Sequence, residues 1–140
     1  HRFTEAILTG APLQVYNNGD MQRDFTYVDD VVESVVRLLH RPPAPDASRT
    51  SDAPDQSPAP FHLFNVGNNA PVQLMDFIRM IEVATGVEAK LELRPMQPGD
   101  VHTTYADSSA LARWVDFAPS TPLAHGVGRY VEWFRDYYKL

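Results

Sequence analysis

The chain has 140 residues, no cysteine and only two lysines, and each scarcity excludes some chemistry. Without cysteine there can be no disulfide, no thiolate nucleophile and no cysteine-ligated metal site, which fits a cytoplasmic protein. The lysines are Lys90 and Lys139, and Gly86 and Arg135 stand four residues before them. A catalytic Tyr-x-x-x-Lys pair is therefore impossible in this sequence.

Two classes of partner are excluded by what the chain lacks. No apolar run approaches the roughly 18 residues of a membrane span, and we expect no membrane partner. The formal net charge is −6, which argues against nucleic acid as the main partner, because binding of the phosphate backbone needs a basic face. A small phosphorylated ligand held by one or two cations remains compatible with this charge.

Cofactor and metal motifs are also scarce. The nearest approach to a glycine-rich phosphate loop is GVGRYV (residues 126–131), which lacks a third glycine and lies inside a helical pattern, where close helix packing is the better explanation. The five histidines are scattered without ligand spacing, so we expect no structural metal. No Gly-x-Ser-x-Gly elbow occurs.

The chain begins without methionine and enters helical spacing at once, which predicts a fragment of a longer protein. Alternating helical and strand patterns predict an α/β fold. We expect helices at residues 2–9, 29–39, 69–85, 107–115 and 121–138, and strand-forming stretches at 13–16, 23–28, 61–67 and 89–95.

Residues 42–60 differ from the rest of the chain. They hold six of the twelve prolines and almost no large apolar side chain. Such a composition cannot bury enough surface to offset chain entropy, so the pattern predicts a flexible surface loop. A linker between two domains is the competing interpretation, which the short flanks disfavour.

Two loop features are candidate binding elements. Arg23 lies between a β-rich stretch and a helix, where its guanidinium could offer a planar fork to a phosphate, or could merely pair with Asp20 or Asp24. In MQPGDV, the Pro98-Gly99 turn presents Asp100 at its exit. That carboxylate could accept two hydrogen bonds from a ribose diol, or could simply cap a turn.

Four segments in order carry a family resemblance: LQVYNNGDMQRDFTYVDDVVESVVRLL, FNVGNNAPVQLMDFIRMIE, LRPMQPGDVHTTYADSSAL and GVGRYVEWFRDYY. Together they resemble the C-terminal part of nucleotide-sugar epimerases of the extended short-chain dehydrogenase family, most closely the UDP-glucuronate 4-epimerase group. The resemblance covers nearly the whole chain outside residues 42–60. It implies the substrate-binding part of an NAD-dependent enzyme, with pieces of the Rossmann sheet contributed by residues 61–67 and the helix beside them.

The resemblance also assigns roles to particular residues. Arg23 resembles the arginine that contacts the UDP diphosphate, and Asp100 resembles the ribose-binding carboxylate. Gln14, Val15 and Tyr16 resemble the strand that lines the uracil. Two further positions depart from common patterns of the family. Gln97 stands where UDP-galactose epimerases often carry a second phosphate-facing arginine, and His102 stands where proline is common.

In the complete enzyme the resemblance implies that NAD abstracts a hydride from C4 of the sugar and returns it to the other face. The NAD-binding portion and the catalytic residues would lie outside this chain, which would hold no catalytic residue and bind no NAD fully. The alternatives are another epimerase, dehydratase or decarboxylase of the same family, or a non-catalytic UDP-sugar-binding module. We further expect a homodimeric complete enzyme, and self-association of the fragment through apolar surface at residues 61–66 and the first helix.

Overall fold

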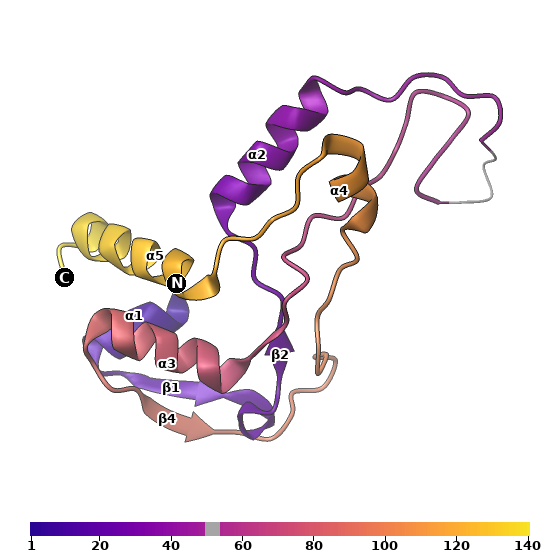
Figure 1. Ribbon diagram of the computed structural model, residues 1–140. Helices are drawn as coiled ribbons and strands as arrows, with labels where there is room; N and C mark the ends of the chain where they lie inside the picture. The colour runs from indigo at the N-terminus through magenta and orange to yellow at the C-terminus, as the bar shows by residue number, and fades with distance from the viewer. Residues whose placement is uncertain (50–53) are drawn as a thin grey trace. The chain divides into compact units, whose positions relative to one another are not determined.

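The computed structural model describes residues 1–49 and 54–140, which form two compact units (Figure 1). Unit 1 comprises His1–Phe25, Ala70–Tyr105 and Thr121–Leu140. Unit 2 comprises Thr26–Asn69 and Ala106–Ser120. Residues 50–53, part of the predicted flexible loop 42–60, lie outside the described residues.

Unit 1 is a mixed α/β structure, as the sequence predicted, and its strands form two small sheets. The strands β1 (Pro12–Val15) and β4 (Lys90–Leu93) pair in parallel, with Leu13 opposite Leu91. The short strands β2 (Gln22–Arg23) and β3 (Val72–Gln73) pair antiparallel. The remaining elements of the unit are α1 (Arg2–Thr9), the 3₁₀ turn η1 (Tyr16–Gly19), α3 (Leu74–Thr85) and α5 (Leu123–Tyr138).

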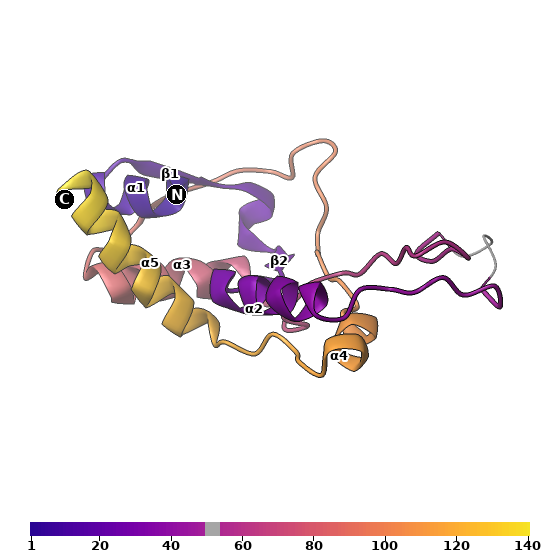
Figure 2. The ribbon, with the colours of Figure 1, turned by 90° about the horizontal axis from the view of Figure 1, so that it is seen from above.

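The core of unit 1 is layered around α1 and α3. On one side Ile78 of α3 packs on the buried β1 residues Leu13 and Val15. On the other side Ile81 of α3 joins a cluster that also contains Ile7, Val127 and Val131. The helix α5 packs on α3 through this cluster; Figure 1 shows α3 between α5 and the strands β1 and β4, and Figure 2 shows α5 crossing α3 obliquely. The prediction that α1 exposes apolar surface is wrong, because Ile7 is buried in this cluster.

Several helix ends differ from the predictions. The helix α3 begins at Leu74, after the cap residue Gln73, and not near Asn69, because residues 72–73 extend to pair with β2. The β-rich stretch 23–28 yields strand structure only at its first residue. The helix α2 (Val28–Leu39) begins one residue before the expected position 29, with Tyr27 as its cap.

The glycine pair of GVGRYV lies within α5, so the stretch is helical as predicted. Close packing is not the reason for glycine at position 128, since a Cβ there would meet no heavy atom within 4 Å.

The expected strand at residues 61–67 is not formed. Among the described residues this stretch makes only an isolated bridge, between His62 and Gln56, although its side chains alternate between exposed and half-buried. A strand is defined by the ladder it makes with a neighbour, and the described part of unit 2 supplies no partner for this one. The alternation is therefore a strand pattern without a sheet.

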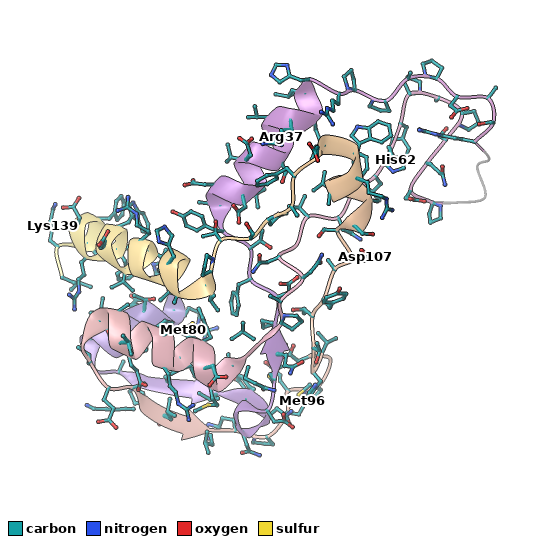
Figure 3. The ribbon with its side chains drawn as sticks, in the orientation of Figure 1. Arg37, His62, Met80, Met96, Asp107 and Lys139 are labelled. Atoms are coloured by element: carbon teal, nitrogen blue, oxygen red, sulfur yellow. The ribbon has the colours of Figure 1, made fainter. Side chains whose placement is uncertain are left out.

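The described part of unit 2 contains the helices α2 and α4 (Ser109–Val115). Arg37 of α2, labelled in Figure 3, donates from Nη1 to the carbonyl oxygens of Asp116 (2.7 Å) and Val115 (3.4 Å), which satisfies the carboxyl end of α4. Ser34 of α2 is fully buried, and its Oγ donates to the carbonyl oxygen of Asp30. The helix α2 therefore packs through polar and small side chains.

The apolar face of α2 is exposed. Its side chains recur at helical spacing, and those more than two fifths exposed are Val28, Val32, Val35, Val36 and Leu39. We call these five residues the α2 stripe. A continuous apolar stripe on a helix normally faces a partner, so unit 2 displays a surface of the kind that drives association.

The described parts of the proline-rich segment, residues 42–49 and 54–60, contain no helix or longer strand. They make local contacts: the Asp46 N–H donates to the Pro58 carbonyl oxygen at 3.0 Å, and the Arg49 guanidinium lies 5.7 Å from the ring centre of Trp114. The flexibility of the segment as a whole stays a prediction.

Gly19 should be the least replaceable glycine of unit 1. Its φ is +86°, and a Cβ would lie 2.6 Å from Sδ of Met75. We expect Gly19→Ala to lower the free energy of unfolding by about 1–3 kcal/mol, from backbone strain and the displacement of Met75. The measurement is a chemical denaturation curve. Gly128→Ala is the matched control, because a helix interior with open space should gain roughly 0.5–1 kcal/mol. Equal effects of the two changes would contradict the assignment.

The α2 stripe should make the chain self-associate. We expect sedimentation velocity to show a concentration-dependent increase in mean sedimentation coefficient, and the double variant Val32→Glu, Val36→Glu to abolish it by placing charges in the stripe. Val83→Glu is the control, since Val83 of α3 is 85% exposed but lies outside the stripe. A wild-type chain that stays monomeric at high concentration would show that this surface does not drive association.

Candidate functional site

The candidate site is built around Gln22, the first residue of β2. On one edge Gln22 pairs with Gln73 of β3. On the other edge its N–H donates to the His102 carbonyl oxygen at 2.9 Å, and its carbonyl oxygen accepts from the Thr104 N–H at 3.3 Å. These bonds hold the loop that follows β4 against β2 and bring residues 100–104 next to Arg23.

The Pro98-Gly99 turn forms as predicted. The Asp100 N–H donates to the Gln97 carbonyl oxygen at 3.1 Å, and Gly99 has φ +84°, the value that a type II turn requires at its third position. The Gln97 side chain is exposed. Asp100 is therefore the last residue of a hydrogen-bonded turn, and the fixed backbone of that turn restricts where its carboxylate can lie.

Arg23 and Asp100, predicted separately from the sequence, are in contact. Nη2 of Arg23 lies 3.1 Å from Oδ1 of Asp100, with the two side chains 25% and 34% exposed. Nη1 of Arg23 donates to the carbonyl oxygens of Gln22 (2.7 Å) and His102 (3.2 Å). The guanidinium is thus held by three acceptors from two segments.

The simpler interpretation of Arg23 named Asp20 or Asp24 as its partner. The partner that the structure gives it is Asp100. Asp20 faces Nε2 of His102 at 3.3 Å, and Oδ1 of Asp24 accepts from the Ala70 N–H at 3.2 Å. A surface pairing within the stretch 20–24 therefore does not account for the orientation of Arg23.

The bonds of Arg23 leave part of its donor capacity available. A guanidinium carries five N–H donors, and the recorded bonds account for both donors of Nη1 and one of Nη2. Across the described ranges no acceptor is recorded for Nε or for the second Nη2 donor. These two nitrogens form one edge of the guanidinium, the geometry that binds an oxyanion through two parallel bonds.

The two carboxylate oxygens of Asp100 also differ in their recorded hydrogen bonds. Oδ1 accepts from Nη2 of Arg23 and, at 2.8 Å, from the Val101 N–H. No donor to Oδ2 is recorded in the described part of the chain. A carboxylate held at one oxygen can present the other to a hydroxyl group.

The three residues predicted to line a base fall into two groups. Val15 is fully buried in the core beneath α3, so its side chain supports the strand and does not line a binding surface. Gln14 and Tyr16 lie on the other face, where the Tyr16 hydroxyl donates to Oε1 of Gln14 at 3.2 Å. The alternation of β1 therefore leaves Gln14 and Tyr16 as the candidate side chains.

Sequence reasoning missed the backbone contribution of His102 to this site. Its carbonyl oxygen accepts from both Gln22 and Arg23. The only signal in the sequence was the run of β-prone residues after the Pro-Gly turn, Val101 to Thr104, which could have predicted a strand-like pairing with β2.

The described residues hold neither a metal-ligand cluster nor a membrane-spanning helix. Within residues 1–49 and 54–140 no group of three or more His, Asp or Glu side chains could hold a metal ion. None of the helices described is both long and apolar enough to cross a membrane.

Comparison with known proteins gives a consistent result. Residues 1–52 match the model of the NAD dependent epimerase/dehydratase family. The chain is 45% identical over 99% of its length to Protein CapI of Staphylococcus aureus, and 41% identical over 99% to a probable UDP-glucuronate 4-epimerase of Rhizobium meliloti. It covers 42% and 41% of these two proteins, so it spans about two fifths of the length of the curated relatives it matches.

A solved structure shares the fold. It is the UDP-glucuronic acid 4-epimerase from Bacillus cereus in complex with UDP-glucuronic acid and NAD. The likeness has a TM-score of 0.77 at 24% identity, and covers 99% of this chain and 40% of that one. The predicted resemblance to part of an extended short-chain dehydrogenase is confirmed at the level of the fold.

Proposed function

We propose that this chain is the nucleotide-sugar-binding part of a UDP-glucuronate 4-epimerase, because residues 1–52 match the NAD dependent epimerase/dehydratase family model and a probable UDP-glucuronate 4-epimerase is 41% identical to the chain. The observation that carries the proposal is the Arg23–Asp100 arrangement, in which a guanidinium edge and a carboxylate oxygen are both left available beside each other. The complete enzyme would convert UDP-glucuronate to UDP-galacturonate.

The geometry of unit 1 supports the binding roles that the family resemblance implies. Arg23 offers the Nε–Nη2 edge to the diphosphate of the ligand, where charge-assisted bonds are strongest. Asp100 offers Oδ2 to the ribose hydroxyls. Gln14 and Tyr16 line the base, and Gln97 stands at the turn that carries Asp100, without adding a second cation for the phosphates.

The function proposed for these contacts is positioning. They hold the part of the substrate that does not react, and so contribute proximity and orientation at the sugar rather than bonds to the reacting carbon. They act equally on substrate and transition state, which is uniform binding.

The residues of this chain do not fit an NAD site of their own. The only glycine-rich stretch lies in the middle of α5, where its backbone N–H groups are used within the helix. We therefore place the cofactor and the catalytic residues in the part of a longer protein outside this chain. The reading frame upstream is the cheapest check of this placement: a Gly-x-x-Gly-x-x-Gly and a Tyr-x-x-x-Lys there would favour an enzyme over a binding module.

Arg23→Ala should weaken binding of UDP in the complete protein. Loss of a charge-assisted contact of roughly 1.5–3 kcal/mol corresponds to about a 10- to 150-fold rise in Kd. Because the contact is to the unreactive part of the ligand, KM should rise while kcat changes less. Arg23→Lys should recover only part of the affinity, since an ammonium keeps the charge without the fork. Calorimetric titration with UDP is the measurement.

The control for this experiment is Arg79→Ala. Arg79 of α3 pairs with Asp76 on the surface of the same unit and is 70% exposed, so its loss should leave UDP affinity unchanged. A melting curve for each variant separates folding from binding. Unchanged UDP affinity in folded Arg23→Ala, with a lowered melting temperature, would assign Arg23 a structural role and end the proposal for this residue.

The isolated 140 residues should not turn over UDP-glucuronate, with or without added NAD. The reason is the missing Tyr-x-x-x-Lys pair and phosphate loop. Chromatography of the UDP-sugars after incubation should show starting material alone. Reproducible UDP-galacturonate from the pure chain would mean that catalytic groups lie within it.

A further inference from the structure

We propose that Asp100 is a positioning residue for Arg23: one oxygen of its carboxylate orients the guanidinium toward a diphosphate while the other remains available to the ligand. This inference rests on the proposed function, because the diphosphate is the group that the oriented arginine would receive. It adds a role for Asp100 that does not depend on ribose.

The geometry supports orientation because Asp100 is itself fixed. Its N–H is bonded within the Pro98-Gly99 turn, and its Oδ1 accepts from the Val101 N–H at 2.8 Å. A carboxylate anchored in this way can hold the long side chain of Arg23, whose Nη1 is anchored separately by two carbonyl oxygens. With Nη1 and one donor of Nη2 engaged, the guanidinium can rotate little, and its Nε–Nη2 edge is presented in one direction.

The two roles of Asp100 do not compete. Oδ1 carries both recorded bonds, so Oδ2 can accept from a hydroxyl without breaking the contact to Arg23. The pair therefore requires no opening step before a ligand binds.

Charge and orientation predict opposite effects for the same substitution. Asp100→Asn removes a negative charge beside the proposed diphosphate position. Electrostatics alone would then strengthen binding of any phosphate ligand. Loss of orientation would weaken it, because the guanidinium would have to be ordered by the ligand itself. The sign of the change therefore separates the two effects, provided that the ligand has no ribose.

Inorganic pyrophosphate is such a ligand. The experiment measures how strongly pyrophosphate competes with UDP for binding to the complete protein, expressed as its inhibition constant. We expect Asp100→Asn to weaken pyrophosphate binding by about 3- to 10-fold, the range for contacting residues with moderate coupling. Asp20→Asn is the matched control. It removes a neighbouring negative charge whose recorded partner is His102 rather than Arg23, and should not weaken pyrophosphate. In an Arg23→Ala background, Asp100→Asn should no longer weaken pyrophosphate, because there is no guanidinium left to orient.

The outcomes distinguish this inference from the function on which it rests. Pyrophosphate binding that is unchanged or tighter in Asp100→Asn, while uridine binding weakens, would leave Asp100 with a ribose contact alone and overturn the positioning role. An equal weakening of pyrophosphate by Asp100→Asn with and without Arg23 would overturn it too. If the wild-type protein bound neither UDP nor pyrophosphate, the proposed function itself would fail.

Discussion

The site in unit 1 depends on the backbone of Gln22, which joins three stretches that are distant in the sequence. One edge of this residue pairs with β3 and the other bonds with residues 102 and 104. Buried or half-buried backbone groups must find partners, and here they do so by drawing the loop after β4 onto β2. The contact between Arg23 and Asp100, which spans 77 positions of the chain, is a consequence of that pairing.

The magnitude of the Arg23–Asp100 contact favours a role in orientation over one in stability. Ion pairs with this degree of exposure contribute roughly 0–1 kcal/mol to folding, because solvent screens the charges and two side chains lose freedom. The turn and the strand pairing already fix the backbone on both sides. What the ion pair adds is a direction for a guanidinium that would otherwise sample several rotamers, and direction matters for bidentate recognition of an anion.

The sequence predicted those features of the fold and site that depend on local chemistry. The Pro98-Gly99 turn follows from the φ preferences of its two residues, and α3 ends at Gly86, whose φ is +70°. Features that depend on pairing could not be read in the same way. The stretch 61–67 has the alternation of a strand and no partner, while residues 72–73, expected in a helix, form a strand because β2 lies beside them. The contact of Arg23 with Asp100 belongs to this second class, since neither residue's neighbours in sequence indicate the other.

The two units differ in how completely they bury their apolar residues, and this difference bears on function. Unit 1 has a core that joins three helices to a sheet, and it contains all the candidate ligand-binding residues. Unit 2 packs α2 through Ser34 and Arg37 and leaves the α2 stripe in solvent. Since the chain spans about two fifths of its relatives' length, a longer protein has further segments that could cover that stripe and pair with residues 61–66. Under the proposed function, binding of the nucleotide part of a substrate uses residues of unit 1, and the reaction uses groups outside this chain. Ligand binding and catalytic turnover can therefore be measured separately, and ligand binding is the property that tests the residues described here.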